Sequence, residues 1–174
     1  MRQTKKLTLC AILTALGAVI MMLGAVVEVL DLTVCALASL IMVFVYLEIG
    51  APYTYLVWIC TSLVTGLIYP GSIVWMEYFL VFGIYPIVKA YVERLTRWLW
   101  IPVKLVYVNA VCLALFFVSE KLFGVPFFED DLLWLKVVTW GVMNIAFLAY
   151  DLFITTMVKF YYDRIRRRFF KFLK

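Results

Sequence analysis

The stretch Leu7–Val27, LTLCAILTALGAVIMMLGAVV, decides the fold class of this chain. It runs for about 21 residues without a charged side chain, and a helix that crosses a bilayer needs about 20 apolar residues. Arg2, Lys5 and Lys6 precede it, as basic residues precede the apolar core of a signal peptide. That core is only about 7–15 residues long. We therefore expect Leu7–Val27 to be a retained first transmembrane helix.

The whole chain has the same apolar character. Of its 174 residues 67% are hydrophobic, and the mean hydropathy is +1.04, whereas soluble proteins are about half apolar. A chain of this length has room for six or seven spans and for no soluble catalytic domain. The composition predicts an all-α, polytopic membrane helix bundle that forms one domain over residues 1–174.

Apolar runs and the turn residues between them predict six helices. They cover residues 7–27, 32–47, 53–69, 72–90, 102–119 and 133–158. Residues 91–101 are expected at the membrane interface, and the basic tail Lys159–Lys174 is expected to continue the last helix along the surface. The second helix is short, and Glu48, Gly50 and Pro52 could break it or make it re-entrant.

The basic residues predict the orientation. With the N-terminus in the cytoplasm, all of the 16 lysines and arginines except Lys121 and Lys136 lie on the inner side. The outer segments are acidic instead, and contain Glu28, Asp31, Glu120, Glu129, Asp130 and Asp131. The positive-inside rule therefore places both termini in the cytoplasm, with an even number of spans in the plasma membrane.

Polar side chains inside the predicted spans are costly in hydrocarbon and invite explanation. Asp151 and Asn109 lie at similar depth toward the cytoplasm, and Lys104 is about one turn from Asn109. A structural polar contact between the fifth and sixth helices explains all three. The alternative is a proton or ion relay, but Glu77 and Asp151 are few groups for a path through the bilayer.

Glu77 has a different neighbourhood, beside Trp75 and Tyr78 near the acidic outer segments. Trp140 and Asn144 of the sixth helix are expected to approach it. Together these five residues could line an outward-opening pocket with apolar walls and a few polar anchors, as small-molecule sites do. Alternatively, the aromatic residues belong to an interfacial belt and Glu77 extends to the surface.

Sequence features of other functions are missing. The chain has no histidine, which is the commonest metal ligand and acid–base catalyst. Its cysteines lie in apolar runs without a CxxC pair, so we interpret them as small buried hydrophobic residues. No nucleophile motif or phosphate loop is present, and the basic clusters flank apolar runs. We expect no enzyme, no cofactor or metal, and no nucleic-acid partner.

The first helix carries a pattern of small residues. Ala11, Ala15, Ala18 and Ala25 fall on one stripe that Met22 completes, and Gly17 and Gly24 lie on a neighbouring face. Small residues four apart allow helices to approach closely. Packing within the bundle would explain the pattern as well as contact with a partner would.

With its basic start, the segment Leu7-Thr8-Leu9-Cys10-Ala11-Ile12-Leu13-Thr14-Ala15-Leu16 resembles the opening of substrate-binding S components of energy-coupling factor (ECF) transporters. The resemblance implies six helices with both termini inside. It also implies that Ala11 and Ala15, as an Ala-x-x-x-Ala motif, dock on a transmembrane coupling subunit, which works with two cytoplasmic ATPases.

The same resemblance implies uptake of a vitamin or a similar trace solute, bound on the outer side. The residues that would line this site are Trp75, Glu77, Tyr78, Trp140 and Asn144. The chain shows none of the substrate signatures of the riboflavin, thiamine, biotin or folate members. The resemblance therefore does not identify the ligand.

A scaffold protein is the main alternative. The small cell-wall morphogenesis subunit of rod-shaped bacteria has similar length and helix count and binds proteins, not a solute. In that case the basic tail Arg164–Lys174 would dock a partner or anionic lipid, although simple anchoring also explains it. A small membrane enzyme or another membrane protein is a third possibility.

Overall fold

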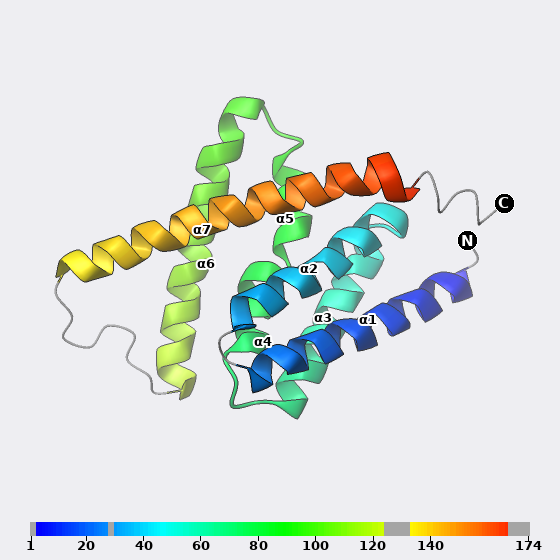
Figure 1. Ribbon diagram of the computed structural model, residues 1–174, viewed down its shortest axis with the longest axis horizontal. Helices are drawn as coiled ribbons and strands as arrows, with labels where there is room; N and C mark the ends of the chain where they lie inside the picture. The colour runs from blue at the N-terminus through cyan, green and yellow to red at the C-terminus, as the bar shows by residue number, and fades with distance from the viewer. Residues whose placement is uncertain (1–2, 28–29, 124–132, 167–174) are drawn as a thin grey trace. The chain divides into compact units, whose positions relative to one another are not determined.

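The computed structural model describes residues 3–27, 30–123 and 133–166. Every regular element in these ranges is a helix, so the predicted all-α helix bundle is confirmed (Figure 1). The chain divides into two compact units, Met1–Asp131 and Leu132–Lys174, and each is described by itself. The single domain predicted for residues 1–174 stays a prediction.

Three helices form one packed group in the first unit. They are α1 (Gln3–Val26), α2 (Asp31–Glu48) and α3 (Ala51–Ile68), and each contacts the other two. Apolar side chains fill the space between them, among them Met21, Cys35, Ala38, Met42 and Val57. The segment that follows α3 in the sequence packs against this group.

Residues 48–52, where the sequence predicted an interruption, form the connection between α2 and α3. Here α2 runs without a break to Glu48, and Gly50 adopts a φ of 112°, a conformation that favours glycine. Pro52 lies in the first turn of α3, where the missing N–H costs nothing. The predicted boundary between two helices therefore lies at these residues, and α2 is continuous; the re-entrant alternative stays a prediction.

The predicted helix 72–90 is not one regular helix. It consists of α4 (Val74–Glu77), the π-helical turn η2 (Tyr78–Phe82) and α5 (Tyr85–Val92). All three pieces contact α2. On one side, α4 and η2 also contact α3; on the other, η2 and α5 contact α6 (Trp100–Phe123). The broken segment thus lies between the α1–α3 group and α6, and side chains from α3 and α6 donate hydrogen bonds to its irregular backbone.

The remaining helices are the last of the first unit and those of the second unit. The 3₁₀ turn η3 (Arg97–Leu99) leads into α6 (Trp100–Phe123), the last helix of the first unit. The second unit consists of α7 (Leu133–Phe160), which continues as the π-helical turn η4 (Tyr161–Ile165). The acidic residues Glu28, Glu129, Asp130 and Asp131 and the tail beyond Arg166 lie outside the described residues.

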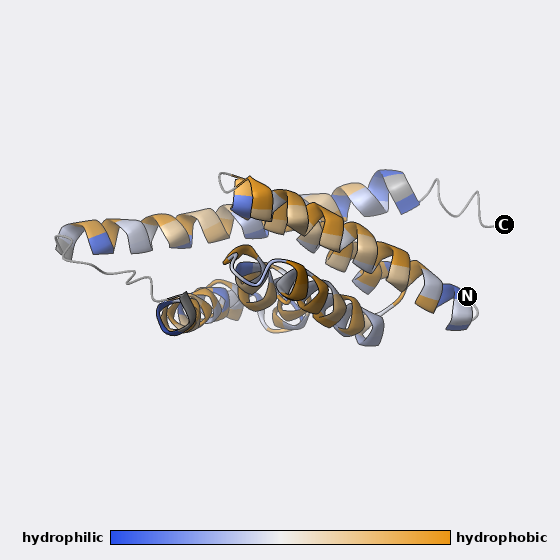
Figure 2. Cartoon of the chain, turned by 90° about the horizontal axis from the view of Figure 1, so that it is seen from below, coloured by the Kyte–Doolittle hydropathy of each residue, from blue (hydrophilic) through white to orange (hydrophobic). Residues whose placement is uncertain are grey.

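The described helices are strongly apolar on their outer surfaces. Five of them are long and apolar enough to cross a membrane: Gln3–Val26, Asp31–Glu48, Ala51–Ile68, Arg97–Lys121 and Trp134–Arg164. Large hydrophobic side chains such as Leu23, Leu67 and Val106 are exposed, and hydrophobic residues predominate along the helices (Figure 2). Such surfaces suit lipid and support a membrane protein.

Candidate functional site

The small residues of α1 lie on two different faces. Gly17 and Gly24 are buried: a Cβ atom at Gly17 would lie 3.2 Å from Thr61 Cγ2, and one at Gly24 would lie 3.0 Å from Val34 Cγ1. These glycines let α1 pack closely on α3 and α2. Packing within the bundle therefore accounts for the glycine face.

The alanines do not share that face. Ala11 and Ala15 are exposed, whereas Ala18, three residues further on, is buried. The predicted stripe of four alanines is thus divided, because Ala18 turns toward the bundle. Larger apolar side chains surround the exposed pair, with Leu7, Ile12, Leu16 and Val19 all exposed. Packing within the first unit does not explain the small size of Ala11 and Ala15.

Trp75 and Glu77 lie in the short helix α4. The Trp75 ring packs on Gly66 of α3, where a Cβ atom would lie 3.3 Å from Trp75 Cδ2. Trp75 Nε1 and Glu77 Oε2 are both buried, and among the described residues neither has a hydrogen-bond partner. Because buried polar atoms are usually paired, this donor and this acceptor are unusual among the described residues.

The first turns of α2 add two polar groups: Asp31, which the sequence placed in a nearby acidic outer segment, and Cys35, which it did not assign to this site. Asp31 lies close enough to Glu77 for the two carboxylates to interact electrostatically. The Cys35 thiol, one turn after Asp31, donates a 3.7 Å hydrogen bond to the Val74 carbonyl oxygen. For Cys35, the signal in the sequence was its i, i+4 spacing from Asp31, which places both on one face of a helix.

The other predicted ligand-binding residues are placed as follows. Tyr78 is only 1% exposed and packs in the core of the first unit. Trp140 and Asn144 lie on α7 in the second unit, where Asn144 Nδ2 donates to the Trp140 carbonyl oxygen at 2.9 Å. Trp75, Glu77 and Tyr78 thus share one segment, and their assembly with Trp140 and Asn144 stays a prediction.

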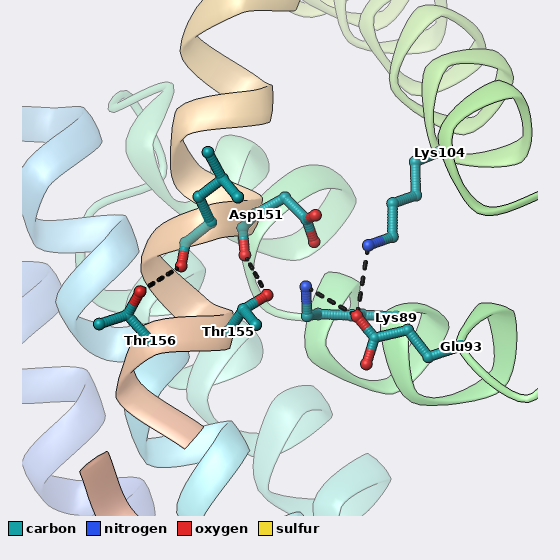
Figure 3. Close-up of polar contacts among 7 residues, drawn as sticks. Lys89, Glu93, Lys104, Asp151, Thr155 and Thr156 are labelled. Atoms are coloured by element: carbon teal, nitrogen blue, oxygen red, sulfur yellow. Dashed lines mark hydrogen bonds and ion pairs between the residues drawn. The ribbon is translucent and has the colours of Figure 1, made fainter. Parts of the chain in front are cut away.

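A buried ion cluster lies at the other end of the broken segment. Lys89 Nζ and Lys104 Nζ approach the same oxygen, Glu93 Oε1, at 3.0 and 3.3 Å (Figure 3). The two lysines are only 4% and 5% exposed. Burying a charge is costly unless it is paired, so the shared carboxylate stabilises both cations and joins α5 to α6.

Sequence reasoning missed this cluster because it paired Lys104 with Asn109 and Asp151. The i, i+4 spacing of Lys89 and Glu93 was the signal that could have found it. Asn109 Nδ2 donates to the Leu105 carbonyl oxygen of its own helix at 2.8 Å. The backbone carbonyl of Asp151 accepts a 2.9 Å bond from Thr155 Oγ1 (Figure 3). The predicted contact between the two helices stays a prediction.

Among the described residues, no three His, Cys, Asp or Glu side chains are grouped so that they could hold a metal ion. Comparisons with protein families, curated proteins and solved structures give no match for this chain. The features of the described residues that bear on function are the exposed alanine pair of α1 and the buried polar atoms of α4.

Proposed function

We propose that this chain is the membrane-embedded, substrate-binding subunit of an ECF-type transporter, and that it serves the uptake of a vitamin-like small molecule. One observation carries the proposal: Ala11 and Ala15 are exposed on α1, while Gly17, Ala18 and Gly24 are buried. If all the small residues had packed within the chain, the bundle alone would have explained them.

An exposed pair of alanines four residues apart suits contact with another helix. Without long side chains, two helix backbones can approach closely and gain van der Waals contact, which drives association in lipid. Lipid itself gives no reason for small residues, because it accommodates the neighbouring Ile12 and Leu16 equally well. A transmembrane coupling subunit is the partner that the resemblance of Leu7–Leu16 implies.

The polar atoms of α4 support a role in ligand binding. Trp75 Nε1 can donate to a ligand and Glu77 Oε2 can accept from it, within an otherwise apolar bundle. A few polar anchors with apolar walls are typical of a small-molecule site. Because the sequence contains no phosphate loop, ATP hydrolysis would fall to separate cytoplasmic ATPases.

The test is purification of the tagged chain from its native membrane in mild detergent, followed by mass spectrometry. We expect a coupling subunit and ATPases with the wild type, and their loss from the double variant Ala11→Trp, Ala15→Trp. The matched control is Ala110→Trp, Ala114→Trp, which changes two exposed alanines at the same spacing on α6. It should retain the partners.

Other outcomes would overturn the proposal. Co-purification of cell-wall synthases with the wild type and with both double variants would favour the scaffold alternative. Retention of the coupling subunit by the α1 variant at the wild-type level would show that the alanine pair is not the docking surface. Equal thermal unfolding of the two double variants ensures that both chains are folded.

A further inference from the structure

The π-helical turn η2 changes the hydrogen bonding of the broken segment. Gly83 N–H donates to the Tyr78 carbonyl oxygen, five residues back, at 2.7 Å. In an α-helix it would donate to Phe79 instead. The Phe79 carbonyl therefore loses its usual partner, and it accepts a 3.1 Å bond from Trp58 Nε1 of α3.

A second carbonyl of the same turn is also paired with a side chain. Tyr107 Oη of α6 donates to the Leu80 carbonyl oxygen at 3.3 Å. An unpaired backbone carbonyl is costly in an apolar environment. Side chains from α3 and α6 thus stabilise a backbone conformation that would otherwise be unfavourable here.

The Trp58 ring also fits the turn sterically. It stacks on the Phe79 ring with a centroid separation of 4.7 Å and an interplanar angle of 8°. A Cβ atom at Gly83 would lie 2.6 Å from Trp58 Cδ1 and 2.8 Å from the Tyr78 carbonyl oxygen. Because real Cβ atoms do not approach other atoms so closely, only glycine leaves room for the indole.

We propose that Trp58 is a latch that holds residues 74–92 in the π-helical register and thereby sets the direction of Trp75 and Glu77. Without the indole N–H, the Phe79 carbonyl regains a partner when Gly83 returns to the α-helical bond. That change removes one residue from the wide turn. One side of the segment then rotates by about 100° and shifts by about 1.5 Å relative to the other.

The moving side is α4. Lys89 in α5 is held by the ion pair with Glu93, and Lys104 of α6 pairs with the same carboxylate. By contrast, α4 has four residues and follows an exposed turn at Tyr69–Gly71. Its rotation must break the core packing of Val74 and Met76, which are buried. The rotation would carry Trp75 and Glu77 to a new direction and would separate the Val74 carbonyl from Cys35. This latch does not depend on the proposed uptake function.

Cys35 is a natural reporter of this movement, because its buried thiol bonds to the Val74 carbonyl oxygen. The experiment uses a chain in which Cys10, Cys60 and Cys112 are replaced by alanine, in its native membrane at fixed pH. The rate of Cys35 modification by N-ethylmaleimide is measured. We expect Trp58→Phe, which keeps a ring but removes the N–H, to raise this rate at least about tenfold. Loss of one buried hydrogen bond should increase the population of the open form by about this factor.

Two controls separate the latch from general loosening. Trp100→Phe removes another indole bond, from Trp100 Nε1 to the Leu95 carbonyl oxygen at 2.9 Å, and should leave the Cys35 rate unchanged. In a chain that keeps only Cys10, Trp58→Phe should not change the rate. Cys10 is near the start of α1 and Cys35 near the start of α2, so the two thiols report on opposite ends of this antiparallel pair.

The proposal is overturned if Trp58→Phe leaves Cys35 as slow as in the wild type, or if Cys10 and Cys35 become reactive to the same extent. Gly83→Ala provides an independent perturbation, because its Cβ atom conflicts with both the indole and the Tyr78 carbonyl. It should raise the Cys35 rate selectively. Tyr107→Phe removes the longer of the two bonds and should have a smaller effect in the same direction.

Discussion

Gly24 of α1 lies so close to Val34 of α2 that a Cβ atom at position 24 would be 3.0 Å from Val34 Cγ1 and 3.1 Å from Val34 Cβ. Val34 is buried and β-branched, so its side chain has few alternative rotamers. This contact fixes how closely α1 and α2 approach. It also shows which small residues of α1 serve the bundle, in contrast to Ala11 and Ala15, which are exposed.

We therefore expect Gly24→Val to destabilise the protein by about 1–3 kcal/mol, the usual cost of overpacking. The matched control is Gly141→Val in α7, where a Cβ atom would meet nothing within 4 Å. Thermal unfolding in detergent measures both variants. Equal stability of the two would contradict the close packing of α1 on α2.

Glu93 is expected to matter more than either of its lysines. Glu93→Gln removes the carboxylate that Lys89 and Lys104 share, whereas Lys89→Met leaves the pair between Glu93 and Lys104. Breaking a buried ion pair costs several kcal/mol. Because the Glu93 side chain is 35% exposed, solvent screens part of that, and we expect a loss of about 1–3 kcal/mol.

The measurement is the free energy of unfolding of Glu93→Gln, Lys89→Met and the double variant. A coupling between the two sites is expected, so the double variant should lose less than the sum of the single variants. Glu120→Gln is the control, since Glu120 is exposed on α6. Strict additivity would show that the shared contact adds nothing to stability.

Glu77 is expected to bind the ligand through its buried, unpaired oxygen. A panel of water-soluble vitamins should contain at least one compound that raises the unfolding temperature of the wild type. Glu77→Gln should weaken binding of that compound by about 10- to 100-fold, since a hydrogen bond to a charged group is worth about 1.5–3 kcal/mol. Unchanged affinity in Glu77→Gln would remove this residue from the site.

Glu120→Gln serves as the control for this measurement too, because it removes a carboxylate from an exposed position of α6. Trp75→Phe tests the donor side of the site, since it keeps most of the ring that packs on Gly66 but removes the indole N–H. A compound that binds Glu77→Gln and Trp75→Phe as tightly as it binds the wild type does not bind at α4.

The sequence predicted the fold class well because apolar length is a one-dimensional property. A run such as Leu7–Val27 has few alternatives to a helix in lipid, and α1 extends it only by one turn toward the N-terminus. The interruption of helix 72–90 was not predicted. It depends on Trp58 and Tyr107, which lie far away in the sequence and donate to carbonyls of the π-helical turn.

The candidate site was predictable only in part, for the same reason. Trp75 and Glu77 could be noted as polar or aromatic residues at a predicted depth, and the structure places both in α4. The approach of Asp31 and Cys35 to this helix depends on tertiary packing. Likewise, helical spacing relates Lys89 to Glu93, but nothing in the sequence brings Lys104 to the same oxygen.

The central prediction is that the broken segment 74–92 crosses the membrane as a sixth span. With about 19 residues at about 1.5 Å each it would be nearly 30 Å long, close to the thickness of the hydrocarbon core. Among the described residues, five longer helices are apolar and long enough to cross. If these were all the spans, their odd number would place the two ends of the chain on opposite sides. The clustering of basic residues favours an even number.

The most direct measurement labels Gly71→Cys and Thr96→Cys, each in a chain without its four native cysteines, with a membrane-impermeant maleimide. Both positions are exposed and flank the broken segment. We expect Gly71→Cys to react in intact cells and Thr96→Cys to react only after the cells are permeabilised. Reaction of both positions from the same side would show that residues 74–92 do not cross the membrane.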